Sequence, residues 1–185
     1  LWAEDGLFAL CIRKADFFTC LTEPYAGYFL FTPRVLAWPV AVLPWEYWAL
    51  ASNILAAILA GLIAAFVVTI ARRASLNGFV FVAIAVLPVL APMSGLEAIN
   101  SVSSSYMLLL YASAIAIALP EAANRSRRWS IGIGLVLLIT ALTIPSAIVL
   151  IPVIVVQGLR RASATGTAIG WVLAVTAGLA AQAIA

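Results

Sequence analysis

The chain of 185 residues contains no histidine and very little charge. Without histidine a Ser-His-Asp triad is excluded, and proton transfer at neutral pH must use a carboxylate, a lysine, a tyrosine or a cysteine. Charged residues make up 9% of the chain and apolar residues 65%, whereas a soluble domain carries about 25% charged residues. These proportions predict an integral membrane protein with several spans.

Other familiar signatures are absent as well. The sequence has no P-loop, no dinucleotide fingerprint and no metal-site spacing. The net charge of +3 reflects individual loops and gives no sign of nucleic-acid binding. The two cysteines, Cys11 and Cys20, either form a disulfide or remain unpaired at the membrane interface. The chain begins at Leu1 without a methionine and ends inside an apolar run, so we interpret it as a fragment.

Residues 1–45 are too polar, or too often interrupted by proline, to cross a membrane. Over residues 7–22 apolar side chains recur at helical spacing, while Arg13, Lys14 and Asp16 fall elsewhere. This pattern predicts an amphipathic helix in the membrane interface. Several tryptophans towards the end of the segment resemble an aromatic interface belt. We therefore expect a first extracytoplasmic loop with interfacial helices.

From residue 46 to residue 185 the sequence predicts an all-α, polytopic transmembrane bundle. Residues 49–70 carry no charge, and about 20 residues suffice to cross a hydrocarbon core of roughly 30 Å. A later apolar stretch is interrupted around Pro145, where two half-length helices fit better than one span because both flanks are basic. The predicted spans are about 46–71, 77–94, 104–119, the broken pair 129–143 and 145–159, and 166–185.

The positive-inside rule orients this bundle. Arginines cluster in loops separated by helix pairs, and these loops are assigned to the cytoplasm. The arginines are Arg72, Arg73, Arg125, Arg127, Arg128, Arg160 and Arg161. Every acid except Glu121 then lies outside, together with three polar breaks: the N-terminal segment, the Glu97–Asn100 loop and the Pro145 turn. Such a face of irregular polar backbone can hold a water-accessible site.

The acidic pair Glu4 and Asp5 is the first candidate for chemistry. In a chain with so few acids it favours a general base or a metal-binding carboxylate, although two solvated acids at the membrane surface give the same pattern. Arg34 follows Pro33 in an apolar segment. It is a candidate phosphate clamp, because a guanidinium binds phosphate in bidentate fashion, or an arginine that extends to the headgroups.

Weaker candidates lie elsewhere on the same face. Arg13 and Lys14 are possible phosphate contacts, but an interfacial helix carries such cations in any case. Glu97 and Asn100 end a span, and loop polarity alone also explains them. Ser146 belongs to a proline break that is most simply a helix kink, although a break at membrane depth also lines cavities.

The order of these features resembles the GT-C superfamily of polytopic glycosyltransferases, and more closely a bacterial branch with the same loop order. The features in chain order are the Glu4–Asp5 pair, an interfacial helix, Pro24-Tyr25-Ala26-Gly27-Tyr28, Pro33-Arg34, Glu97–Asn100, and Leu142 to Pro152 before a basic loop. The resemblance covers roughly Trp2 to Arg161. It implies a GT-C-like fold in the bacterial inner membrane, with the active face extracytoplasmic.

The resemblance also implies a chemistry. A hexosyl- or pentosyltransferase of this kind takes a sugar from a polyprenyl-phosphate-linked donor and passes it to a glycan or lipid acceptor. An acid of the first outer loop acts as catalytic base or metal contact, a position that Asp5 and Glu4 occupy here. We favour Asp5 as the base and Glu4 as its neighbour or as a contact for a divalent metal ion. Arg34 is available to the lipid phosphate, and transfer by single displacement inverts the anomeric centre.

Two other classes of function stay open. The broken stretch around Pro145 is typical of a transporter or lipid flippase, but no ionisable residue lies at the middle of a span. A non-catalytic membrane subunit is the third hypothesis, since small residues on the spans could pack against a partner or within one chain. These small residues are Gly61, Ala64, Ala65, Gly132 and Gly134.

Overall fold

The computed structural model describes residues 3–24, 29–90, 102, 106–119, 127–160 and 165–184. Across these ranges all regular structure is helical and no strand occurs, so the all-α prediction is confirmed. The first helices are α1 (Ala3–Lys14), α2 (Phe17–Thr22), α3 (Phe31–Ala41) and the short 3₁₀ helix η1 (Trp45–Tyr47). The later helices are α4 (Trp48–Arg73), α5 (Gly78–Leu90), α7 (Tyr106–Ala118), α9 (Arg127–Thr143), the 3₁₀ helix η3 (Pro145–Val149), α10 (Leu150–Arg160) and α11 (Thr165–Ile184).

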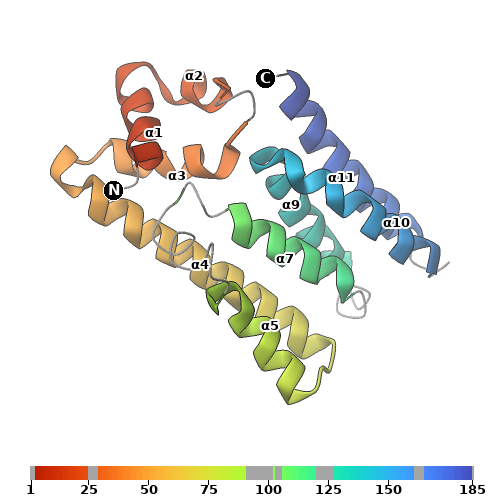
Figure 1. Cartoon of the computed structure of the whole chain (residues 1–185). Helices are drawn as coiled ribbons and strands as arrows, with labels where there is room; N and C mark the ends of the chain where they lie inside the picture. The colour runs from red at the N-terminus through yellow and green to blue at the C-terminus, as the bar shows by residue number, and fades with distance from the viewer. Residues whose placement is uncertain are drawn as a thin grey trace.

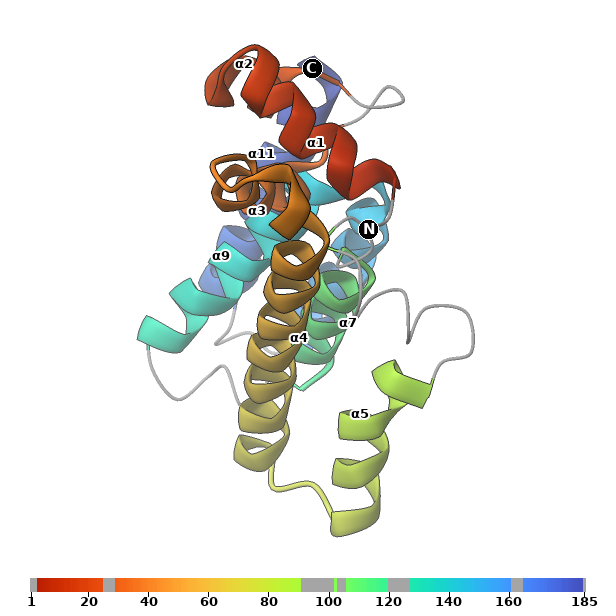
Figure 2. The same ribbon diagram turned by 90° about the vertical axis from the view of Figure 1, so that its left-hand side faces the viewer.

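The helices form two regions that differ in direction and length (Figure 1). Helices α1, α2 and α3, which we call the N-terminal unit, lie together at one end of the molecule, and the chain also ends there (Figures 1 and 2). Helices α4 to α11, which we call the helical bundle, extend away from that end. Within the bundle α9 contacts α7 and α11, and α4 contacts α5 and α7. The N-terminal unit therefore covers one end of the bundle.

The core of the bundle lies where α9, α10 and α11 meet. Leu137, Ile154 and Val175 are fully buried there. Helices α9 and α11 approach so closely that a Cβ added to Gly178 would lie 2.6 Å from the Cβ of Ala141. Real side chains do not approach each other to that distance, so this contact requires glycine.

Hydrogen bonds between side chains also join the helices of the bundle. The hydroxyls of Ser113 on α7 and Thr140 on α9 lie 2.8 Å apart, and both residues are fully buried. The indole N–H of Trp171 on α11 donates to the backbone carbonyl of Ser130 over 3.1 Å. Such bonds hold helices together where the helix backbone is already paired within itself.

The apolar helices follow the predicted spans closely, but most are short. The segment Trp45–Arg73 is long and apolar enough to cross a membrane, as judged by length and composition. Shorter apolar helical segments of 10 to 17 residues include Met107–Ala118, Arg128–Thr143, Pro145–Gln157 and Thr167–Ala183. The predicted interruption before Pro145 is confirmed, because α9 ends at Thr143 and η3 begins at Pro145.

The predicted single helix over residues 7–22 is wrong in one respect. The structure divides this segment into α1 and α2, with the break at Ala15 and Asp16. The carboxylate of Asp16 accepts the backbone N–H of Thr19 over 2.9 Å and so caps the start of α2. Aspartate favours this capping position over a helix interior, which explains why the helical spacing alone did not reveal the break.

Candidate functional site

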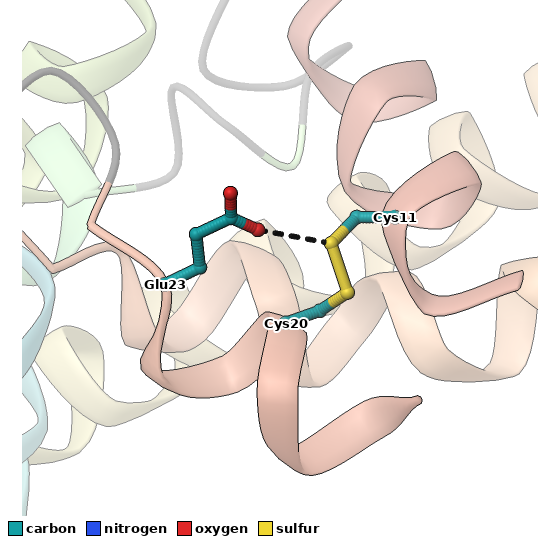
Figure 3. A group of neighbouring side chains, drawn as sticks. All are labelled: Cys11, Cys20 and Glu23. Atoms are coloured by element: carbon teal, nitrogen blue, oxygen red, sulfur yellow. Dashed lines mark hydrogen bonds between the residues drawn. A yellow bond between two sulfur atoms is a disulfide. The ribbon is translucent and has the colours of Figure 1, made fainter. Parts of the chain in front are cut away.

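The two cysteines of the N-terminal unit form a disulfide. Cys11 on α1 and Cys20 on α2 are joined, with their Cα atoms 5.9 Å apart. Figure 3 shows Glu23, which follows α2, directed towards this bond, and its Oε2 lies 3.3 Å from the Cys11 Sγ. A disulfide sulfur carries no proton, so this is a contact between sulfur and a carboxylate oxygen rather than a hydrogen bond. The disulfide thus ties α1, α2 and Glu23 together.

The same three side chains are the candidate metal cluster of the described ranges. The sulfurs of Cys11 and Cys20 and a carboxylate oxygen of Glu23 lie within 4.8 Å of one another. Metal ions bind the thiolate form of cysteine, and a disulfide offers no thiolate. In its oxidised form the cluster therefore does not fit a metal ion. The metal contact predicted for Glu4 and Asp5 stays a prediction.

Arg34 on α3 is buried against this disulfide-linked pair of helices. Its side chain is 4% exposed, and one Nη donates to the backbone carbonyl of Cys20. Its guanidinium carbon lies 5.4 Å from the ring centre of Phe8 and 5.9 Å from that of Phe29. The Nε has no hydrogen-bond partner among the residues that the structure describes. The alternative interpretation, an arginine whose side chain extends outward to the lipid headgroups, is wrong, because Arg34 is buried between the helices of the N-terminal unit.

Burial and a neighbouring acid act in opposite directions on Arg34. Desolvation by burial lowers the pKa of the guanidinium below its usual value, and the negative charge of Glu23 acts to raise it. Arginine keeps its proton in proteins, so Arg34 carries a positive charge at neutral pH. A buried cation with an unpartnered N–H favours binding of an acceptor from outside the chain.

A pocket of about 200 Å³ opens beside Arg34, between the helices of the N-terminal unit. The residues that line it are Leu7, Phe8, Cys11, Cys20, Glu23, Pro24 and Arg34. Apolar groups form most of its wall, and it holds one positive and one negative side chain. Sites for drug-sized ligands span about 300 to 1,000 Å³, so this pocket suits a smaller group.

Asp5 lies on α1 one turn before Phe8 and is 4% exposed. Residues three apart share a face of a helix, so Asp5 and Phe8 both face inward. The Oδ2 of Asp5 accepts the backbone N–H of Val102 over 3.3 Å. Asp5 therefore contacts Val102, whereas the predicted site residues Glu97 and Asn100 fall outside the described ranges. The backbone of Glu4 belongs to α1, while its side chain also falls outside them.

The Pro145 break also contacts the N-terminal unit. The hydroxyl of Thr143, at the end of α9, lies 2.8 Å from that of Thr32 on α3, and it also accepts the backbone N–H of Thr32 over 3.3 Å. Ser146 itself is exposed on η3 and does not line the pocket. The Pro145 break thus reaches the N-terminal unit through direct hydrogen bonds.

The remaining predicted cations lie away from the pocket. Arg13 and Lys14 end α1 and are exposed. The guanidinium carbon of Arg13 lies 5.8 Å from the ring centre of Trp48, and the pocket lining includes neither cation. Their role as phosphate contacts stays a prediction that this geometry does not favour.

Two pocket residues were missed by sequence reasoning. Glu23 was placed only among the outer acids, and Phe8 was not singled out. The spacing of Cys11 and Cys20 could have pointed to both, since a disulfide between them brings residues 8 and 23 together. Comparison with family models, with curated proteins and with solved structures finds no match.

Proposed function

We propose that the chain belongs to a multi-pass membrane glycosyltransferase that moves a sugar from a polyprenyl-phosphate donor to an acceptor on the extracytoplasmic face. One observation carries the proposal. Asp5, a buried acid, lies on the same face of α1 as Phe8, and Arg34, a buried arginine with an unpartnered N–H, contacts the ring of Phe8. Sugar transfer from a phospholipid needs one group of each kind.

The reaction assigns a step to each of these residues. Asp5 accepts the proton of the acceptor hydroxyl as its oxygen attacks the anomeric carbon. The bond between that carbon and the phosphate oxygen breaks, and the lipid phosphate leaves with the electron pair. Arg34 stabilises the negative charge on the departing phosphate. Attack from the face opposite the leaving group inverts the anomeric centre.

The exposed surface of the bundle supports several membrane spans. Large apolar side chains recur every fourth residue along α4, at Leu50, Ile54, Ile58 and Leu62, and each is at least half exposed. Helices α5, α9, α10 and α11 carry further exposed valine, leucine and isoleucine. Monomeric soluble proteins rarely expose apolar patches larger than a few hundred Å². A lipid environment accounts for these surfaces on all five helices.

Two features support an extracytoplasmic N-terminal unit. Disulfides persist in oxidising compartments and are rare in the cytosol, and Cys11 and Cys20 are bridged. Arg72 and Arg73 end α4 at the end opposite to the N-terminal unit, as the positive-inside rule requires (Figure 2). Both features support the proposed orientation, with the site outside, in the bacterial inner membrane that the resemblance implies.

The test is sugar transfer by the full-length protein in membrane vesicles that contain a labelled polyprenyl-phosphate sugar. We expect Asp5→Asn combined with Glu4→Gln to lower the rate by at least about 100-fold, which is the usual contribution of a general base. Glu46→Gln is the matched control, because Glu46 is an exposed acid on η1, outside the N-terminal unit, whereas Asp5 is buried on α1. Transfer that survives the double change would contradict the assigned roles.

The break between α9 and α10 favours a second candidate, a transporter or lipid flippase. Discontinuous helices form substrate sites in many transporters, and α9 stops at Thr143 before η3 begins. Movement of a labelled lipid across liposomes, without any sugar transfer, would favour this candidate over the transferase.

A further inference from the structure

The transfer reaction leaves one feature of the pocket unexplained. Glu23 lines the same pocket as Arg34 and puts a negative charge near it. A pocket for a phosphate alone loses affinity when a carboxylate stands beside the arginine, because like charges repel. The charge pair instead matches a ligand that carries both signs.

The two charged side chains occupy different environments. Arg34 is buried and keeps an unpartnered Nε–H, whereas Glu23 is exposed. Leu7, Phe8 and Pro24 supply the apolar wall between them. An anionic group fits the buried side of such a pocket, and a cationic group fits the exposed side.

Each helix of the N-terminal unit carries a large exposed apolar side chain. Leu7 on α1 is 52% exposed, Phe18 on α2 is 76% exposed, and Trp38 on α3 is 54% exposed. Aromatic side chains of this kind gather at the level of the lipid headgroups. The ligand most available at that level is a phospholipid.

We propose that the pocket binds the headgroup of a zwitterionic phospholipid of the phosphoethanolamine type, with its phosphate at Arg34 and its ammonium at Glu23. The volume of about 200 Å³ matches a group of this size. The inference shares Arg34 with the proposed function but requires neither a sugar donor nor transfer. In a working transferase a donor phosphate would displace this headgroup.

The disulfide positions both charged walls. Cys20 offers its carbonyl to Arg34, and the sulfur of Cys11 contacts the carboxylate of Glu23. Reduction of the disulfide releases α2 from α1 and therefore loosens both contacts. Headgroup binding is expected to weaken when the protein is reduced.

The experiment measures lipid affinity of the full chain, purified in a neutral detergent, by native mass spectrometry. The probes are short-chain phosphatidylethanolamine, phosphatidylglycerol and phosphatidylcholine. We expect phosphatidylethanolamine to bind about fivefold more tightly than phosphatidylglycerol, which lacks the ammonium, given the usual strength of an exposed ion pair. Phosphatidylcholine should also bind more weakly, because its larger ammonium has no N–H to donate. Equal or tighter binding of phosphatidylglycerol would overturn the proposal.

Variants separate this site from a simple anion site. Glu23→Gln should abolish the preference for phosphatidylethanolamine while binding of phosphatidylglycerol stays equal or increases. Arg34→Gln should lower the affinity for all three lipids by at least about tenfold, because a charged hydrogen bond is lost. Glu23 is exposed, so its variant stays informative even if Arg34→Gln does not fold. Glu46→Gln is the control and should leave the preference for phosphatidylethanolamine unchanged. If that preference persists in Glu23→Gln, the proposed site is contradicted.

These measurements contain no sugar donor. An inactive transferase would therefore leave the lipid result standing, and a transferase that works without any lipid preference would refute only the headgroup site.

Discussion

The N-terminal unit and the helical bundle bury polar groups of different kinds. Among the described residues the buried charges are Asp5 and Arg34, and both belong to the N-terminal unit. The buried polar side chains of the bundle are neutral serine, threonine and glutamine. Burial of a charge costs far more free energy than burial of a paired hydroxyl, so charges are kept where function needs them. The buried charges therefore make the N-terminal unit, rather than the bundle, the place of the proposed site.

Gln182 on α11 shows how the bundle satisfies its polar groups. Its side-chain amide donates to the carbonyls of Phe29 and Ala141 and accepts the N–H of Phe29. Arg34, by contrast, is left with an unpartnered Nε beside a pocket. A satisfied network rigidifies a scaffold, whereas an open donor favours a ligand.

Loss of the disulfide should give the largest difference in stability between the two regions. The bond closes a loop between residues nine apart in sequence, and a loop of that length contributes about 2 to 3 kcal/mol. We expect Cys11→Ser with Cys20→Ser to lower the free energy of local unfolding of α1 and α2 by that amount and to leave α9 and α11 unchanged. Hydrogen exchange of the two regions checks this. Faster exchange throughout the bundle would show that the regions are not independent.

Gly178→Ala should instead destabilise the bundle, where α9 packs against α11. The added Cβ would overlap the Cβ of Ala141, and overpacking of this kind typically costs about 1 to 3 kcal/mol. Gly170→Ala on the same helix is the control, since a Cβ there meets nothing within 4 Å. In thermal unfolding in detergent, the melting temperature should fall for Gly178→Ala and stay unchanged for Gly170→Ala. Equal effects would refute the close contact of α9 with α11.

The hydrogen bond between Thr32 and Thr143 joins the two regions, so its removal should couple them. A double-mutant cycle of Thr32→Val and Thr143→Val is expected to give an interaction energy of about 0.5 to 1.5 kcal/mol. Thr176→Val is the control, because the Thr176 hydroxyl bonds only within α11. Strict additivity of the two changes would mean that this bond does not link the regions.

The smallest effect is expected at the start of α2 and depends on pH. Hydrogen bonds from the Thr19 hydroxyl, and then from the Thr19 backbone N–H, hold the pKa of Asp16 below its usual 3.8. A lowered pKa means that the cap contributes its full stability above about pH 4 and loses it as the pH falls through the lowered value. NMR of the Thr19 amide should follow this titration. Asp16→Asn should keep the cap without the titration, whereas an amide shift centred above pH 3.8 in the unchanged chain would contradict the assignment.

Much of the bundle could be predicted from sequence because apolar runs and basic loops mark helix ends directly. The broken pair at Pro145 was located for this reason, since proline has no N–H to continue the helix. The division of α1 from α2 was not predicted. Asp16 would also fit the polar face of one long helix. Only its hydrogen bond with the Thr19 backbone N–H shows that it caps the start of a second helix.

The sequence singled out Asp5 and Arg34 at the candidate site but not the pocket or its acid, Glu23. Asp5 and Arg34 stood out because charge is scarce, and both prove to be buried. Glu23 and Phe8 gave no such signal, because one follows the rule for outer acids and the other for apolar faces. The pocket depends on a disulfide, and sequence alone left that bond open.

The most direct test of the division into an outer site and a membrane scaffold is the sidedness of the two regions in intact cells. After treatment with an impermeant reductant, we expect an impermeant maleimide to label Cys11 and Cys20 from outside. In a chain without these cysteines, Ser75→Cys, in the exposed turn after α4, should be labelled only after the membrane is opened. The reverse pattern, with Ser75→Cys labelled from outside and the native cysteines only after lysis, would contradict the extracytoplasmic site.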